Sequence, residues 1–105
     1  MKIDFNKSLL NFMGQPVIKK SQGKEMPQKL WDMIAEALYS AGIDSQQPMD
    51  TSKKLKAYNM LQQLIHNNGV IEAETEDMAL LKEICASFFT AGAYGQIHEL
   101  IEKGE

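Results

Sequence analysis

The sequence predicts a mostly α-helical fold: about four short helices packed as an orthogonal or irregular bundle, with a short N-terminal β-hairpin or arm. Three observations support this class. Apolar residues recur at three- and four-residue spacing in four segments, which is the period of an amphipathic helix. Proline, glycine and asparagine interrupt the chain between these segments. The first 26 residues lack this period and instead carry two short apolar runs around a glycine.

One domain is expected from the 105 residues, with an arm or hairpin at residues 1–26 and a helical core at residues 27–105. This length is near the common size of a single domain. Such a chain can bury roughly two thirds of its unfolded surface, which is enough for one core without disulfides or metal ions. Hydrophobic residues make up 44% and charged residues 24%, which is the composition of a globular protein.

The N-terminal segment has the pattern of a hairpin around Gly14-Gln15. Apolar runs at residues 9–13 and 16–18 flank this pair, and such runs around a glycine turn are typical of hairpins. Pro16 has no N–H and therefore suits the start of a strand or a sheet edge. The polar residues 19–25 are expected to form a mobile loop.

The first helix is expected from about Pro27 to Ala41. Proline is favourable in a first turn, because its missing N–H would be unpaired there, and Gly42 is suited to a C-terminal cap. A linker is expected at residues 43–50, which include Pro48. The apolar stripe of this helix comprises Leu30, Trp31, Ile34, Ala35 and Leu38.

A second helix is expected to start at Thr51 or Ser52 and to end near Asn67. The sequence "HNNG" ends it, because asparagine and glycine tolerate the left-handed conformation of a cap. Residues 70–73, "VIEA", are long enough only for an extended link or a small strand, which could pair with the N-terminal arm. The predicted buried face of the second helix comprises Leu55, Tyr58, Leu61, Leu64 and Ile65.

Thr75 is the predicted N-cap of a third helix. Glu76 and Asp77 follow in its first turn, where carboxylates meet the positive end of the helix dipole. A short last helix is expected from about Ala93 to Glu102. The stripe of the third helix comprises Met78, Leu81, Ile84, Cys85 and Phe88, and that of the fourth Tyr94, Ile97, His98 and Ile101.

The stretch "TAGAYGQIHEL", residues 90–100, contains a Gly-x-x-Gly pair similar to a phosphate clamp. No basic residue flanks the pair before Lys103, and the predicted preceding element is a helix rather than the strand that a dinucleotide or Walker loop requires. We therefore expect a helix–helix corner. Gly92 would let the chain leave the third helix, and Gly95 would let the last helix approach its neighbour closely or start late. The sequence leaves open whether residues 92–95 bind a ligand weakly.

Charge and hydropathy lower the odds of nucleic-acid and membrane binding. The net charge is −3, the lysines are expected to be scattered, and arginine is absent. Because arginine is the best residue for bidentate phosphate or guanine recognition, we expect no direct contact with nucleic acid. No segment approaches the roughly 20 apolar residues of a membrane span, so we expect no membrane contact. The N-terminus shows no secretory signal, which favours the cytoplasm.

Catalytic, metal and cofactor sites are not expected. Cys85 falls on a predicted buried stripe, where free cysteine acts as a small apolar residue. His66 and His98 lie in separate helices without further ligands at zinc-binding spacing. The acidic cluster of Glu72, Glu74, Glu76 and Asp77 lacks the spacing of an EF-hand and suits capping and solubility. The sequence therefore predicts no enzyme and no cofactor.

The best functional indication is a surplus of methionine and aromatic residues. There are seven methionines, several of which lie off the predicted stripes, and a methionine-rich surface can adapt to partners. Exposed apolar patches usually mark association with a partner or a second copy. The candidate partner surface comprises Phe12, Met13, Met26, Trp31, Met49, Met60, Phe89 and Tyr94.

Taken in order, several segments resemble those of short phage- and prophage-encoded proteins. These are the arm "IDFNKSLLNFMGQPV", the helix "KAYNMLQQLI", the segment "NGVIEAETEDMALLKE" and the closing "YGQIHELIE". The resemblance covers most of the chain. That group has no settled activity, so the resemblance assigns no site residues. It implies an origin in a mobile element and a bacterial cytoplasm.

The leading hypothesis is a non-enzymatic phage-type accessory or assembly protein that acts by protein–protein contact and by self-association as a homo-oligomer. Its expected partner is a protein, which could be a second copy of the chain. The alternative is an acidic regulator that binds a nucleic-acid-processing or transcription protein. A third hypothesis is a small enzyme that uses His98 with Tyr94, which would require both side chains to line one pocket.

Overall fold

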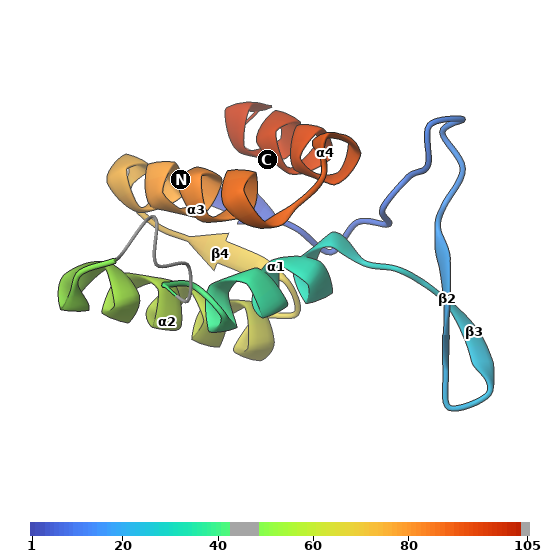
Figure 1. Ribbon diagram of the computed structural model, residues 1–105, viewed down its shortest axis with the longest axis horizontal. Helices are drawn as coiled ribbons and strands as arrows, with labels where there is room; N and C mark the ends of the chain where they lie inside the picture. Colours follow the sequence, from blue (N-terminus) through green and yellow to red (C-terminus); the bar gives the residue numbers. More distant parts are fainter. Residues whose placement is uncertain (43–48, 104–105) are drawn as a thin grey trace.

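The computed structural model describes residues 1–42 and 49–103 (Figure 1). Its described part is mostly helical with short strands, which confirms the predicted class. The orthogonal or irregular bundle geometry stays a prediction, and the linker expected at residues 43–50 lies mainly outside the described residues. The elements are β1 (Lys2–Asp4), β2 (Ile18–Ser21), β3 (Lys24–Pro27), α1 (Leu30–Tyr39), α2 (Thr51–His66), β4 (Val70–Glu72), α3 (Thr75–Phe88) and α4 (Ala91–Lys103).

Two strands from distant parts of the sequence form a small sheet inside the helical body. β1 pairs antiparallel with β4, with Ile3 opposite Ile71, and both side chains are fully buried. Figure 1 shows β4 between the α1–α2 pair and the α3–α4 pair. The small strand expected at residues 70–73 is confirmed, together with its N-terminal partner. Residues 1–5 therefore belong to the core, and the arm expected at residues 1–26 begins later.

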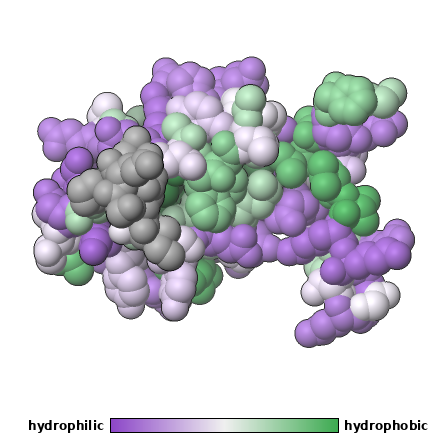
Figure 2. All heavy atoms as spheres, viewed as in Figure 1, coloured by the Kyte–Doolittle hydropathy of each residue, from purple (hydrophilic) through white to green (hydrophobic). Residues whose placement is uncertain are grey.

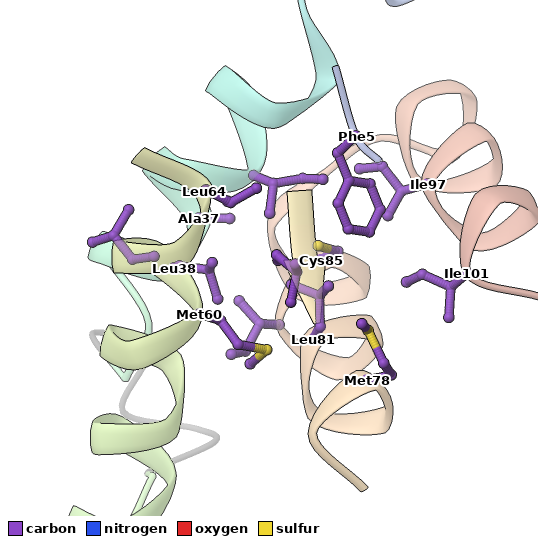
Figure 3. Packing of buried hydrophobic residues seen from close by; sticks show 14 of the residues in the cluster. Phe5, Ala37, Leu38, Met60, Leu64, Met78, Leu81, Cys85, Ile97 and Ile101 are labelled. Carbon is purple, nitrogen blue, oxygen red and sulfur yellow. The ribbon is translucent and has the colours of Figure 1, made fainter. Parts of the chain in front are cut away.

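Side chains from all four helices and from β1 and β4 share one apolar core. Figure 3 shows Phe5 pointing toward Ile97 of α4, with Leu81 and Cys85 of α3 nearby. Phe5 lies directly after β1 and is 0% exposed. The core is therefore built around the β1–β4 sheet, and it packs residues near the N-terminus against the C-terminal helix α4.

The buried face of α2 differs from the predicted one. Leu61 and Leu64 are buried as expected, but Leu55, Tyr58 and Ile65 are exposed. The inward positions are Ala57, Met60, Leu61 and Leu64, which follow the same three- and four-residue spacing. α2 carries two overlapping apolar stripes, and the inner one contains the small residue Ala57, which contributes little to a hydropathy pattern.

Helix ends lie within three residues of the predicted ends, and the start of α2 at Thr51 is as predicted. α1 begins at Leu30 rather than Pro27, because residues 24–27 are strand. The N-cap of α3 is Glu74, and Thr75 is the first helical residue, so the predicted Thr75 cap is wrong. The side chain of Asp50 caps α2 by accepting from the Lys53 N–H at 2.8 Å.

Candidate interaction surface

Residues 7–29, which we call the arm, project from the helical body (Figure 1). β2 and β3 pair antiparallel within it, with Ile18 opposite Pro27. Between the strands, Gln22 and Gly23 both have positive φ, 52° and 79°. This is the combination of a type I′ turn, whose twist matches that of the flanking strands. The mobile loop expected at residues 19–25 is therefore wrong, because these residues form a β-hairpin.

Three backbone hydrogen bonds form a ring at the base of the arm. The Leu9 N–H donates to the Gln28 carbonyl at 2.7 Å, and the Gln28 N–H donates to the Val17 carbonyl at 2.8 Å. The Val17 N–H completes the ring by donating to the Leu9 carbonyl at 2.8 Å. Because each backbone donor finds an acceptor on another pass of the chain, the base holds a fixed shape.

Gln96 of α4 ties the arm to the helical body. Its Oε1 accepts from the Leu10 N–H at 2.9 Å, and its Nε2 donates to the Leu10 carbonyl at 2.8 Å and to the Gly92 carbonyl at 3.0 Å. The side-chain amide thus pairs with both the N–H and the carbonyl of Leu10, as the backbone of a neighbouring strand would. A salt bridge between Lys19 and Asp32, 2.5 Å long, joins the hairpin to α1.

The Gly92–Gly95 stretch is part of a helix and not a corner. α4 begins at Ala91 and includes both glycines, and a Cβ added at either would meet no atom within 4 Å. Neither glycine is therefore required for close packing, contrary to the sequence-based expectation. Within this stretch, the side chain of Gln96 makes the hydrogen bonds that join the arm to α4.

A compact turn holds the most exposed apolar residues of the arm. The Asn11 Oδ1 accepts from the N–H groups of Met13 and Gln15 at 2.9 and 3.1 Å, and Gly14 has a φ of 80°. Phe12 is 99% exposed and Met13 is 69% exposed. The predicted turn at Gly14-Gln15 is present as a longer turn over residues 11–15, closed by a bridge between Leu10 and Pro16. The backbone of the turn is therefore held by its own hydrogen bonds while its apolar side chains are exposed.

The predicted partner residues divide into three groups. Phe12, Met13 and Met26 are exposed on the arm. Met60 is 2% exposed and lies in the core (Figure 3), so its place on a partner surface is wrong. The remaining four are partly buried and pack against the core: Trp31, Met49, Phe89 and Tyr94.

Several exposed apolar residues were assigned to the core from the sequence or not singled out. Leu10 and Ile18 add to the arm, and Tyr39 stands on α1. Phe88, expected to be buried, is 49% exposed, because α3 ends there and the extended Phe89 turns inward instead. Leu55, Tyr58 and Ile65 on α2 are exposed as well. For the arm, the Gln22-Gly23 pair was the available indication of a turn, and the lysine-rich residues on either side of it are not typical of strands.

Charge is distributed unevenly between the arm and the helical body. Five of the 11 lysines and one glutamate lie in residues 7–29, which gives the arm a net charge of +4. Residues 70–105 contain eight acidic residues and two lysines, a net charge of −6. The lysines are therefore not scattered as expected. In Figure 2 the β2–β3 hairpin is largely hydrophilic, whereas the turn above it carries a hydrophobic cap.

The described residues show little that suits catalysis. Cys85 is buried as predicted, and this burial raises the pKa of its thiol to about 12, which leaves the thiol protonated at neutral pH. The rings of Tyr94 and His98 lie 5.8 Å apart, and His98 Nδ1 is buried without a hydrogen-bond partner. No group of His, Cys, Asp and Glu in the described ranges could hold a metal ion.

A shallow open groove of about 360 Å³ lies between β4, α2 and α3. It is lined by polar side chains, among which Lys56 and Asp77 form a salt bridge at 3.5 Å. Tyr94 and His98 do not line it. Its mixed charges and open shape give no indication of a particular ligand.

Comparison with protein-family models, curated proteins and solved structures finds no match to this chain. In the described residues, each helix is too short or too polar to cross a bilayer. The arm, with its anchored base, apolar turn and basic hairpin, is therefore the feature from which a function can be argued.

Proposed function

We propose that this chain is a non-enzymatic accessory protein that acts by protein–protein contact, with the arm as its contact surface. The observation that carries the proposal is the exposure of Phe12 and Met13 on a hydrogen-bonded turn. Such residues usually mark an association site. Burying these two side chains against a partner would contribute about 3–6 kcal/mol.

The construction of the arm supports this function. A flexible segment loses conformational entropy when it binds, whereas a segment already fixed in shape loses much less. The ring of hydrogen bonds at Leu9, Val17 and Gln28 and the Gln96 anchor fix the arm before it meets a partner. The phage-type resemblance and the bacterial cytoplasm are part of the same proposal.

Site-specific photocrosslinking tests this function. Phe12 is replaced by p-benzoylphenylalanine in cells that express the chain, and Tyr39, which is 83% exposed on α1, is replaced in a matched control. We expect a discrete protein adduct from position 12 and none from position 39. Equal labelling at both positions, or no protein adduct at position 12, would contradict the proposal.

A further inference from the structure

The outer face of α3 is acidic and carries no large side chain along most of its length. Glu76, Ala79, Glu83 and Ala86 recur at three- and four-residue spacing and are all exposed, so they share one face of the helix. Phe88 is half-exposed at the C-terminal end of α3, on a different side of the helix. Among the described residues, neither Glu76 nor Glu83 has a salt-bridge partner. We call Glu76, Ala79, Glu83 and Ala86 the α3 face.

The arm has the complementary chemistry. Lys20 and Lys24 are exposed near the Gln22-Gly23 turn, and no salt bridge engages them within the described part of the chain. Phe12 and Met13 occupy the other end of the arm. The arm therefore presents a basic end and an apolar end, and α3 presents carboxylates along one face and an exposed ring at its C-terminal end.

The two surfaces also match in length. α3 has 14 residues, which corresponds to about 21 Å. Residues 16–21 connect the apolar turn to the basic turn in nearly extended form, which spans roughly 20 Å at the rise of a strand. Figure 1 shows the two turns at opposite ends of the arm.

We propose, on the basis of the proposed function, that the partner of the arm is a second copy of this chain, and that the arm of one copy lies along the α3 face of the other. Lys20 and Lys24 then lie near Glu76 and Glu83, and the turn with Phe12 lies near Phe88. An arm cannot reach its own α3 face, because Gln96 and the ring at its base hold it away from the helical body.

The charge pattern favours this partner over two others. Two arms would repel each other, since each carries a net charge of +4, and lysines on strand edges oppose edge-to-edge pairing. A nucleic acid would meet the basic arm favourably but would be repelled by the acidic residues 70–105. In a pair of copies, each basic arm meets the acidic α3 face of the other copy. Because both contacts are the same, the pair forms a closed dimer.

Charge reversal with complementation tests the proposal. Sedimentation velocity is recorded for the wild type, for Lys20→Glu/Lys24→Glu, for Glu76→Lys/Glu83→Lys, and for an equal mixture of the two variants. We expect the wild type to associate in about 50 mM NaCl and to dissociate in about 500 mM, as screening predicts. Each variant alone should associate at least tenfold more weakly. The mixture should regain association, because each arm then meets an α3 face of opposite charge.

Matched controls make the result specific. Lys53→Glu/Lys103→Glu and Glu36→Lys/Glu99→Lys change the net charge by equal amounts elsewhere and should associate like the wild type. All the substituted residues are exposed, and thermal unfolding followed by circular dichroism checks that each variant is folded.

Two outcomes overturn the inference. If the wild-type chain stays monomeric at low salt, its partner is not a second copy. The proposed function would still hold if position 12 formed an adduct with a different protein. A mixture that regains no association excludes the α3 face. Fluorescence anisotropy with labelled single- and double-stranded DNA tests the remaining alternative, that the two lysines bind nucleic acid. That alternative holds if the wild type binds DNA, if Lys20→Glu/Lys24→Glu does not, and if mixing the two variants does not restore DNA binding.

Discussion

Phe5 and Phe12 are seven positions apart and occupy opposite environments. Phe5 follows β1 and is 0% exposed in the core, whereas Phe12 is 99% exposed on the arm. Both are held by ordered backbone: Phe5 by the β1–β4 sheet and Phe12 by the Asn11 turn. Apolar residues of the helical body are buried and stabilise the fold, whereas those of the arm's turn stay exposed and do not.

Truncating each phenylalanine should give the largest contrast. Phe5→Ala removes a fully buried ring and should lower the free energy of unfolding by about 3–5 kcal/mol. Phe12→Ala removes an exposed ring and should change it by no more than about 0.5 kcal/mol. Urea unfolding of both variants measures the difference. Similar losses in the two variants would mean that the arm packs as part of the core.

Two glycines should respond in opposite directions to alanine. Gly69 has a φ of 94°, and an added Cβ would lie 3.0 Å from the Trp31 side chain and 3.1 Å from the Asn6 nitrogen. Gly69→Ala should therefore destabilise the body by roughly 2 kcal/mol or more. Gly95→Ala, inside α4 with open space around it, should stabilise by about 0.5–1 kcal/mol. Thermal unfolding measures both effects, and destabilisation by Gly95→Ala would restore the close-packing role expected for that glycine from the sequence.

Alkaline pH should weaken the body through Cys85. Burial raises the pKa of its thiol from 9.0 to about 12 in the folded protein, so the unfolded chain loses this proton first. The stabilising contribution is complete below pH 9 and is lost as pH rises toward 12, at up to about 1.4 kcal/mol per pH unit. Urea titrations of the wild type and Cys85→Ala between pH 8 and 10.5 isolate this slope. Equal slopes in both proteins would refute it.

Removing the Gln96 anchor should loosen the arm and leave the core nearly unchanged. Gln96→Ala removes two hydrogen bonds to Leu10, which together contribute about 1–3 kcal/mol, mostly to local order. Hydrogen exchange should show faster exchange at the Leu10 amide, while core amides such as that of Leu81 keep their protection. Gln62→Ala, on α2, is the control, and unchanged protection at Leu10 would count against the anchor.

The helices and the β1–β4 pairing could be predicted because local chemistry and the tertiary structure agree there. Amphipathic spacing, Gly42 and the "HNNG" end located the helices to within a few residues, whereas Pro27 lies in β3. The predicted face of α2 failed because Leu55, Tyr58 and Ile65 form a second stripe that spacing alone cannot distinguish from Ala57, Met60 and Leu64. Which stripe is buried depends on contacts with α1, β4 and α3.

The candidate surface could be predicted only in part. Phe12, Met13 and Met26 were identified because they lie off any helical stripe. The anchored shape of the arm was not predictable, because the Gln96–Leu10 hydrogen bonds join residues 86 positions apart. The β2–β3 hairpin was missed because Gln-Gly is a weaker turn pair than Asn-Gly and its strands are rich in lysine.

The claim that the arm is the contact surface between two copies is tested most directly by sedimentation velocity on Phe12→Ser/Met13→Ser beside the wild type at the same concentration and low salt. We expect an assembled wild type and a monomeric variant with the same thermal unfolding, since neither side chain supports the core. Assembly of the variant as tight as that of the wild type would contradict it.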